Sequence, residues 1–140
     1  MTSKKKKIGL IVGSGDLAIF CVQQLVILGH EIVILRLPCS KIKIAKNIDH
    51  IDIDYEKINE AFSYLKQNSI SDIAMIGYLE RPVIDVAKAS VESQRILSKV
   101  VSTLNKGDGA IFTAIKKMLI DENFNLLKVQ DLLPELTLPS

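Results

Sequence analysis

The sequence has few of the residues that build metal centres or disulfide frameworks. Among its 140 residues there are two cysteines and two histidines, and tryptophan is absent. Cys21 and Cys39 do not stand at a metal-ligand spacing and follow no secretory signal, so we expect reduced, inert thiols in a cytoplasmic protein. His30 and His50 have no partner at a recognised spacing, which favours surface histidines over metal ligands or catalytic bases. We therefore expect no cofactor and no metal in this chain.

The sequence also lacks a large excess of charge and a long apolar run. Its formal net charge is +2, and the lysine run at residues 4–7 supplies much of it, so the remainder offers no broad basic face for nucleic acid. This run is most simply a solvated tail, because basic clusters hold membranes only weakly without a second anchor. No apolar stretch is long enough to cross a bilayer. We expect at most peripheral membrane contact and no nucleic-acid partner.

The composition is that of one globular domain, with 48% hydrophobic and 24% charged residues. Near the start, IGLIVGSGDLA (residues 8–18) places a short apolar run before a glycine loop. Gly13, Gly15 and Ala18 fit the G-x-G-x-x-G/A spacing of loops that hold a pyrophosphate at the N-terminus of a helix. We expect Asp16 to cap that helix, although its negative charge would repel a phosphate placed close by.

The segment after the glycine loop completes a strand–helix–strand opening. Residues 17–28 predict a helix that ends at Gly29, and EIVILRL (31–37) predicts a second buried strand. Dinucleotide-binding folds usually carry an acidic residue at the end of this strand, where it holds the ribose hydroxyls. Here the strand ends near Arg36, which could meet a 2′-phosphate but is more commonly an exposed arginine without that role. We therefore expect no useful NAD(P) binding.

Strand and helix patterns alternate along the rest of the chain. The expected elements are a strand at 50–54, a helix with an apolar face of Ile58, Ala61, Phe62 and Leu65, a strand at 72–77, a helical segment at 83–104 broken once, a helix that Asp108 caps, and a last strand at 126–129. This alternation predicts an α/β fold, a three-layer Rossmann-like sandwich with a mainly parallel sheet. Such sheets bind ligands where the strands end, so we expect Gly13, Gly15, Gly77 and Gly107 to lie together at that edge.

A catalytic centre is harder to find than a binding loop. Neither histidine lies in a motif that would activate a serine or cysteine nucleophile. The one dense acidic group consists of Asp49, Asp52, Asp54 and Glu56, and alternation along a strand would expose it on one face and at the strand end. A solvated face is the favoured interpretation of this group, and a cation site is the alternative.

Four motifs together resemble a known family. They are IGLIVGSGDLA (8–18), AMIGYLERP (74–82), NKGDGA (105–110) and LLPELTLP (132–139). In this order and at these separations they look like the N-terminal half of the LpxI family of UDP-2,3-diacylglucosamine pyrophosphatases, which make lipid X and UMP in lipid A biosynthesis. The resemblance covers nearly the whole chain. It implies a cytoplasmic bacterial hydrolase, peripheral to the inner membrane, that depends on Mg²⁺ or Mn²⁺ and holds its substrate between two domains.

The resemblance also implies how the chain is divided. Residues 1–7 would be a basic tail, 8–133 the Rossmann-like N-terminal domain, and 134–140 the start of a linker to a C-terminal catalytic domain absent from this chain. The family's catalytic aspartate and metal site belong to that second domain, so no catalytic or metal residue is assigned here. The resemblance transfers substrate contact, with backbone donors from the glycine loop and positive charge from two side chains. The substrate-binding candidates are Gly13, Ser14, Gly15, Asp16, Gly77, Arg81, Lys106, Gly107 and Asp108.

Three hypotheses follow from these residues. The leading one is the substrate-docking domain of such a pyrophosphatase, inactive without its second domain, with UDP-2,3-diacylglucosamine or lipid X as ligand. The second is a nucleotide- or NAD(P)-binding module that uses the glycine loop. The third is a non-enzymatic domain that associates with itself as a homodimer. An exposed apolar patch around Leu132, Leu133, Leu136 and Leu138 would favour this third hypothesis.

Overall fold

Five strands form one sheet in the computed structural model of this chain. The structure describes residues 7–38, 40–77, 84–101, 109–128 and 132. The strands are β1 (Lys7–Val12), β2 (Glu31–Arg36), β3 (Asp49–Asp52), β4 (Asp72–Ile76) and β5 (Asn125–Leu127), and their order across the sheet is β3-β2-β1-β4-β5. Every neighbouring pair is parallel. The expected parallel sheet is confirmed, and β1 begins at Lys7, inside the expected tail.

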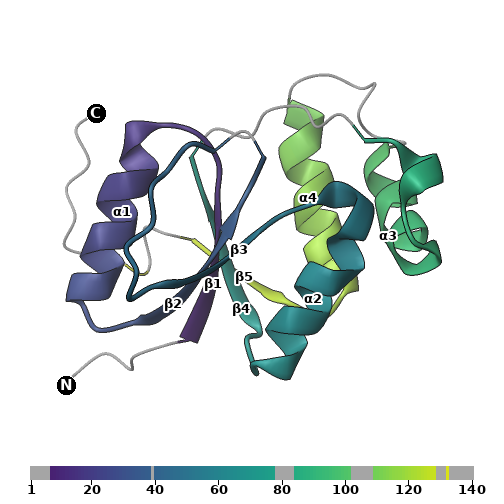
Figure 1. The fold of residues 1–140 in the computed structure, drawn as a ribbon. Helices are drawn as coiled ribbons and strands as arrows, with labels where there is room; N and C mark the ends of the chain where they lie inside the picture. The colour runs from purple at the N-terminus through teal and green to yellow at the C-terminus, as the bar shows by residue number, and fades with distance from the viewer. Residues whose placement is uncertain (1–6, 39, 78–83, 102–108, 129–131, 133–140) are drawn as a thin grey trace.

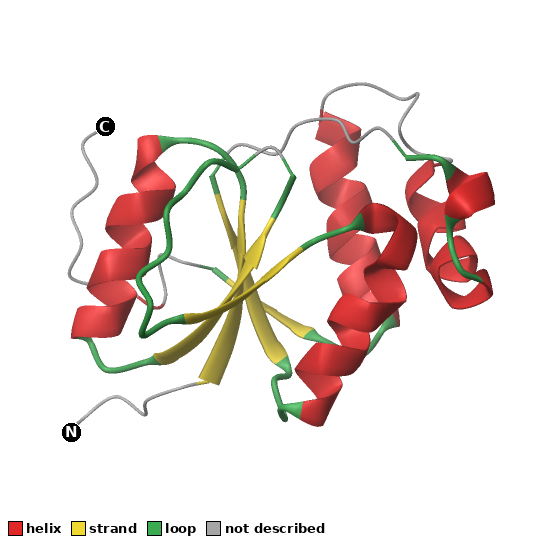
Figure 2. Cartoon of the chain, in the orientation of Figure 1, coloured by secondary structure: helices red, strands yellow, loops and turns green. Residues whose placement is uncertain are grey.

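Helices cover both faces of the sheet (Figures 1 and 2). On one face lies α1 (Asp16–Ile27), and on the other lie α2 (Ile58–Gln67), α3 (Val91–Val101) and α4 (Gly109–Asp121). Short 3₁₀ turns, η1 (Tyr55–Lys57) and η2 (Val86–Lys88), precede α2 and α3. The three-layer sandwich expected from the sequence is confirmed. It arises because each crossover between parallel strands must return over one face of the sheet.

The core has two parts, one on each face of the sheet. Ile8, Leu10 and Val12 of β1 pack toward α1, whereas Ile11 packs toward the other three helices. Successive side chains of a strand point to opposite faces, and both faces are covered here, which explains the continuous apolar run of β1. The apolar stripes of α2 and α4 are buried as expected, and their described members are Ile58, Ala61, Phe62, Leu65, Ala114, Ile115, Met118 and Leu119.

The connection from β2 to β3 contains no helix among its described residues. Its residues 40–48 lie beside α1 on the same face of the sheet, where a crossover helix would otherwise stand (Figures 1 and 2). Ile42 is buried in the core on the α1 side, and Ile44 and Ile48 pack against that core. We call residues 40–48 the lysine loop, because the segment also carries three exposed lysines. The layer on this face therefore consists largely of α1 and the lysine loop.

The boundaries of α1 correct one expectation and confirm another. The N-cap of α1 is Gly15, and Asp16 is the first helical residue, so the expectation that Asp16 caps the helix was wrong. The physical reason is that the chain enters the helix with φ 115° and ψ 156° at Gly15, a conformation that residues with a Cβ rarely adopt. Gly29 has φ 88° and follows the helix as the expected left-handed residue. The expected break within 83–104 is also confirmed, since η2 and α3 are separate.

Candidate functional site

The carboxyl ends of β1 and β4 bring two glycine-containing turns together. Gly13 follows β1, and its amide N–H donates to the carbonyl oxygen of Ile76, the last residue of β4, at 2.9 Å. Gly77 follows β4 and has φ 89°. A Cβ at position 77 would lie 2.8 Å from the carbonyl oxygen of Ser14 and 3.2 Å from the carbonyl carbon of Gly13. Glycine is required at 77 because both its own backbone conformation and the close approach of the glycine loop exclude a side chain.

The glycine loop (13–15) leads into the N-terminus of α1. Gly15 is exposed, and no neighbouring heavy atom lies within 4 Å of the position that a Cβ would take there. As the N-cap residue, Gly15 has no side chain to accept a hydrogen bond from the first turn of the helix. A helix start of this kind suits an anion, because its unpaired N–H groups and its dipole both favour negative charge. Asp16 is exposed in the first turn, where its negative charge interacts favourably with the helix dipole. The same charge would repel a phosphate bound close by.

The predicted site residues fall into two groups. The structure places Gly13, Ser14, Gly15, Asp16 and Gly77 at the edge of the sheet where β1 and β4 end. The expected juxtaposition of Gly13 and Gly77 is thereby confirmed, whereas contact of these residues with a substrate stays a prediction. The remaining candidates lie outside the described residues, and they are Arg81, Lys106, Gly107 and Asp108, the last of which was also expected to cap a helix.

The side chain of Arg36, at the end of β2, is held by a carboxylate from the neighbouring strand. The parallel register pairs Arg36 with Asp52 of β3. Arg36 Nε and Nη2 donate to the two carboxylate oxygens of Asp52 at 2.5 and 3.1 Å, and Nη1 donates to the carbonyl oxygen of Ile42 at 2.9 Å. The sequence interpretation missed this pair. Opposite charges at the ends of two strands are the signal that could have found it, once the two strands are known to be neighbours.

The Arg36–Asp52 pair lies at the end of β2, the position at which dinucleotide-binding folds hold the ribose. The hydrogen bond from Arg36 lowers the pKa of Asp52, and the same bond raises the pKa of Arg36. The carboxylate of Asp52 is therefore ionised at neutral pH, and both of its oxygens accept from the guanidinium. The arginine considered for a 2′-phosphate is likewise engaged in three hydrogen bonds. The arrangement differs from the ribose site of a dinucleotide-binding fold, in which an acid at the end of the second strand meets the sugar.

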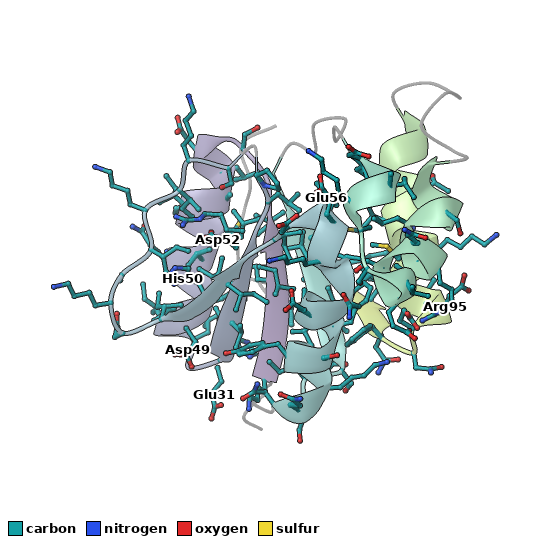
Figure 3. The ribbon with its side chains drawn as sticks, turned by 45° about the vertical axis from the view of Figure 1, so that its right-hand side comes forward. Glu31, Asp49, His50, Asp52, Glu56 and Arg95 are labelled. Atoms are coloured by element: carbon teal, nitrogen blue, oxygen red, sulfur yellow. The ribbon has the colours of Figure 1, made fainter. Side chains whose placement is uncertain are left out.

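The acidic group around β3 is spread out rather than gathered around a cation (Figure 3). Asp52 binds Arg36, and Asp54 accepts from the backbone N–H of Glu56 at 3.0 Å and thereby caps η1. Among the residues that the structure describes, no three His, Cys, Asp or Glu side chains are grouped as a metal site would require. These residues do not fit the Mg²⁺ or Mn²⁺ that the family resemblance implies, so no chemical step is assigned through a metal.

Two sequence expectations can be checked in the core on the α1 side. Cys21 is buried, and burial raises the pKa of its thiol, which keeps the sulfur protonated and weakly reactive. Leu132 is also buried in this core, so it adds no surface to the exposed apolar patch considered for self-association. The other leucines of that patch, and Cys39, lie outside the described residues.

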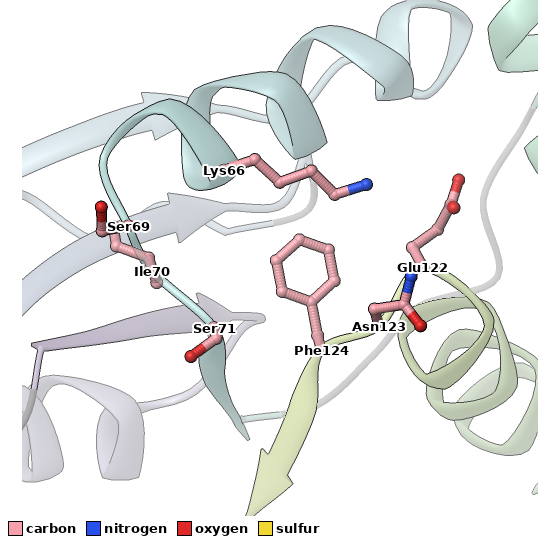
Figure 4. A pocket seen from close by; sticks show the side chains of 7 residues that line it. All are labelled: Lys66, Ser69, Ile70, Ser71, Glu122, Asn123 and Phe124. Atoms are coloured by element: carbon pink, nitrogen blue, oxygen red, sulfur yellow. The ribbon is translucent and has the colours of Figure 1, made fainter.

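A pocket that the sequence did not predict lies at the opposite edge of the sheet (Figure 4). It has a volume of about 380 Å³ and is placed where α2 and α4 end and where β4 and β5 begin. Lys66 Nζ lies 5.9 Å from the centroid of the Phe124 ring, and Glu122 accepts a hydrogen bond from Arg95 at 3.0 Å. Both charged side chains of the pocket thus already have partners. The pocket is therefore a weaker candidate site for an ionic ligand than the edge of the sheet where the glycine loop meets Gly77.

Comparisons of the sequence with known proteins connect this chain to a family. A sequence model described as the LpxI N-terminal domain matches residues 7–136. A curated relative, the UDP-2,3-diacylglucosamine pyrophosphatase LpxI of Caulobacter vibrioides, is 20% identical over 134 residues, which cover 96% of this chain and 48% of that protein. The chain therefore spans about half the length of this relative.

Solved structures share the fold at low sequence identity. A short chain dehydrogenase from Leptospira borgpetersenii with bound NAD⁺ has a TM-score of 0.50 and 14% identity, covering 89% of this chain and 51% of that chain. The Bordetella bronchiseptica enzyme WbmG in complex with NAD has a TM-score of 0.49 and 12% identity, covering 89% of this chain and 37% of that chain. The first likeness supports the Rossmann-like arrangement and nothing beyond the fold. The match over residues 7–136 shows that this chain belongs to the LpxI N-terminal domain family.

Proposed function

We propose that this chain is the substrate-docking part of a UDP-2,3-diacylglucosamine pyrophosphatase and binds the phosphate end of that substrate or of lipid X. The family match and the name of the curated relative support this substrate class. Hydrolysis is assigned to the complete protein, because the chain spans 48% of that relative and its described residues contain no group of three His, Cys, Asp or Glu side chains that could hold a metal. The proposed location is the bacterial cytoplasm, at the inner membrane where such a lipid would be met.

The observation that carries this proposal is the packing of the glycine loop against Gly77 at the carboxyl edge of the sheet. The N–H of Gly13 already donates to Ile76. We therefore assign the phosphate to the N–H groups of Gly15 and of the first turn of α1, where the dipole favours an anion. Such a site binds and orients a phosphate. It supplies neither a base nor a nucleophile, so the chemistry of pyrophosphate cleavage must come from elsewhere in the complete protein.

Calorimetric titration with lipid X tests the docking role. Asp16→Asn removes a negative charge beside the proposed phosphate position, so we expect it to tighten binding by about fivefold, as one unit charge at about 4 Å in water would. Glu60→Gln is the matched control, because Glu60 is an exposed acid in the first turn of α2 on the other face of the sheet. Equal effects of the two variants, or no binding of lipid X, would contradict the proposal. Micromolar affinity for NAD(P) would favour the nucleotide-binding module instead.

An assay for UMP release tests the division of labour. We expect no release from UDP-2,3-diacylglucosamine by this chain alone, with Mg²⁺ or with Mn²⁺. Release that appears only when a separate C-terminal half of such a pyrophosphatase is added, and that Arg81→Ala or Lys106→Ala reduces, would support the docking role. Metal-dependent release by the chain alone, abolished by changing one of its own carboxylates, would show that the catalytic residues are in this chain.

A further inference from the structure

The outer face of α1 is apolar, unlike the outer faces of the other described helices. Its exposed large hydrophobic side chains, including that of the C-cap residue, are Leu17, Ile19, Phe20, Val26, Ile27 and Leu28. On the opposite layer, Val91 and Ile120 are the described side chains of this kind. Ile27 is 73% exposed, and Asp16 is the one charged residue of α1. Gln23 is the one exposed polar residue between these side chains, and an apolar surface of this kind indicates an interaction site.

The lysine loop adds positive charge beside this face. Lys41, Lys43 and Lys46 are exposed, while the isoleucines between and after them pack into the core on the α1 side. None of the three lysines forms an ion pair with another described residue. Arg36 fixes the loop through its hydrogen bond to the carbonyl oxygen of Ile42. The loop therefore presents three unpaired ammonium groups on a backbone that is anchored to the sheet.

The described acidic residues of α1, β2 and β3 lie at the ends of these elements, and Asp52, at the end of β3, is paired with Arg36. Asp16 begins α1 at the carboxyl edge of the sheet. Glu31 and Asp49 begin β2 and β3 at the opposite edge, as their labels in Figure 3 show. The lysine loop itself contains no acidic residue. The middle of the layer thus combines apolar side chains with lysines that form no ion pair with a described carboxylate.

We propose that α1 and the lysine loop form a surface that docks on a bilayer with anionic headgroups. Such a bilayer complements the surface in two ways. The apolar side chains enter the boundary of the acyl chains, and the lysines bind the phosphates of the lipid headgroups. A second copy of this chain is a poorer partner, because a two-fold contact through this face would bring the same lysines close together. The contact lies on the surface of the membrane, with the 12-residue α1 parallel to it. No helix among the described residues is long and apolar enough to cross a bilayer.

Co-sedimentation with vesicles tests the contribution of charge. The probes are vesicles of phosphatidylglycerol with phosphatidylethanolamine and, for comparison, vesicles of phosphatidylcholine alone. We expect binding to the anionic vesicles to weaken about tenfold or more when Lys41, Lys43 and Lys46 are changed together to Gln. Lys57, Lys88 and Lys117 changed together to Gln are the matched control, because these exposed lysines carry the same charge on the other layer. The control should lose less than about threefold.

A second pair of variants tests the contribution of the apolar face. Phe20→Gln combined with Ile27→Gln should weaken binding to the anionic vesicles about tenfold, because these side chains would no longer enter the acyl boundary. The matched control combines Val91→Gln with Ile120→Gln, which removes two exposed apolar side chains from the opposite layer and should leave binding unchanged. Far-ultraviolet circular dichroism confirms that each variant is folded before its binding is compared.

Three outcomes would overturn the proposal. The first is equal loss of binding in the variants of the two layers. The second is binding that disappears when the lysines of the run at 4–7 are changed to Gln and that the α1 and lysine-loop variants do not affect. The third is a chain that sediments as a dimer and becomes a monomer in the Phe20 and Ile27 variant without any change in vesicle binding, which would assign the face to self-association. The result does not depend on whether the pyrophosphatase assignment is correct.

Discussion

The layer of α1 and the lysine loop and the layer of α2, α3 and α4 cover one sheet from opposite sides, but their outer surfaces differ. The inner faces are alike, since Leu25 of α1 and Leu97 and Leu119 of the other layer are fully buried. The outer face of the second layer carries paired charges, such as Arg95 with Glu122 at 3.0 Å. The outer face of α1 is apolar. Packing against the sheet therefore accounts for the inner residues of both layers, and the outer residues of α1 require another explanation.

The largest expected effects test whether the inner faces are equivalent. Leu25→Ala in α1 and Leu119→Ala in α4 should each lower the free energy of unfolding by about 2–5 kcal/mol, because each leaves a cavity in a fully packed core. Ile27→Gln on the outer face of α1 should change it by less than about 0.5 kcal/mol. Urea denaturation measures all three. A large loss from one buried leucine and a small loss from the other would show that the sheet depends on one layer more than on the other.

The next effect concerns the edge of the sheet where the glycine loop, which leads into α1, meets Gly77. Gly77→Ala should cost about 2–4 kcal/mol, because it adds a clash with the carbonyl oxygen of Ser14 to an unfavourable backbone conformation. Gly15→Ala has the strained backbone but open space around the new methyl group, so it should cost about 1–2 kcal/mol. Denaturant titration of the two variants gives the difference. Equal costs would mean that the approach of the two turns adds nothing to the requirement for glycine.

A buried polar contact between α2 and α3 should give a smaller effect. Ser93 is fully buried, and its Oγ donates to Asn59 Oδ1 at 2.6 Å and accepts from the Asn59 N–H at 3.1 Å. Ser93→Ala leaves that N–H without its acceptor and should lower the free energy of unfolding by about 1–2 kcal/mol. Ser98→Ala, at an exposed position of the same helix, should change it by less than about 0.5 kcal/mol. Indistinguishable melting curves for the two variants would remove this contact from the list of features that hold the second layer.

The smallest expected effect concerns the pair that anchors the lysine loop. The pKa of Asp52 is lowered in the folded chain by its hydrogen bond to Arg36. Its contribution is therefore present above the ordinary pKa of an aspartate and is lost as the pH falls through the lowered value. Because the carboxylate is 64% exposed, Asp52→Asn should cost only about 0.5–1 kcal/mol at pH 7. Denaturation at several pH values should show this difference shrinking below about pH 4, and a difference that persists in acid would contradict the assigned cause.

Much of the fold could be predicted because it depends on residues near one another in the sequence. The apolar face of α2 repeats at helical spacing, and the continuous apolar run of β1 indicates a strand covered on both faces. Other features depend on the register of distant segments. Arg36 meets Asp52 only because β2 and β3 are adjacent and parallel, and the burial of Leu132 depends on where the chain returns to the sheet. No local pattern contains that information.

The candidate site was predictable to the same extent. The spacing of Gly13 and Gly15 and the glycine after a buried strand at 77 predicted two turns at one edge of the sheet, and the turn at 13 and the turn at 77 do meet there. The direction of individual groups was not predictable. The N–H of Gly13 donates to the carbonyl oxygen of Ile76, and Gly15 rather than Asp16 is the N-cap of α1. Both features depend on backbone angles that the spacing of the glycines does not determine.

The connection from β2 to β3, which has no helix among its described residues, has a consequence for local unfolding of the sheet. β3 has four residues and forms the edge of the sheet, with β2 as its hydrogen-bonded neighbour. The lysine loop before β3 has few backbone hydrogen bonds to other described residues, such as that from the Ser40 N–H to the carbonyl oxygen of Leu37. This segment can therefore separate while β1, which has strands on both sides, stays paired. The amide protons of β3 should exchange with solvent long before those of β1, so β3 and the lysine loop form a unit of lower local stability than the centre of the sheet.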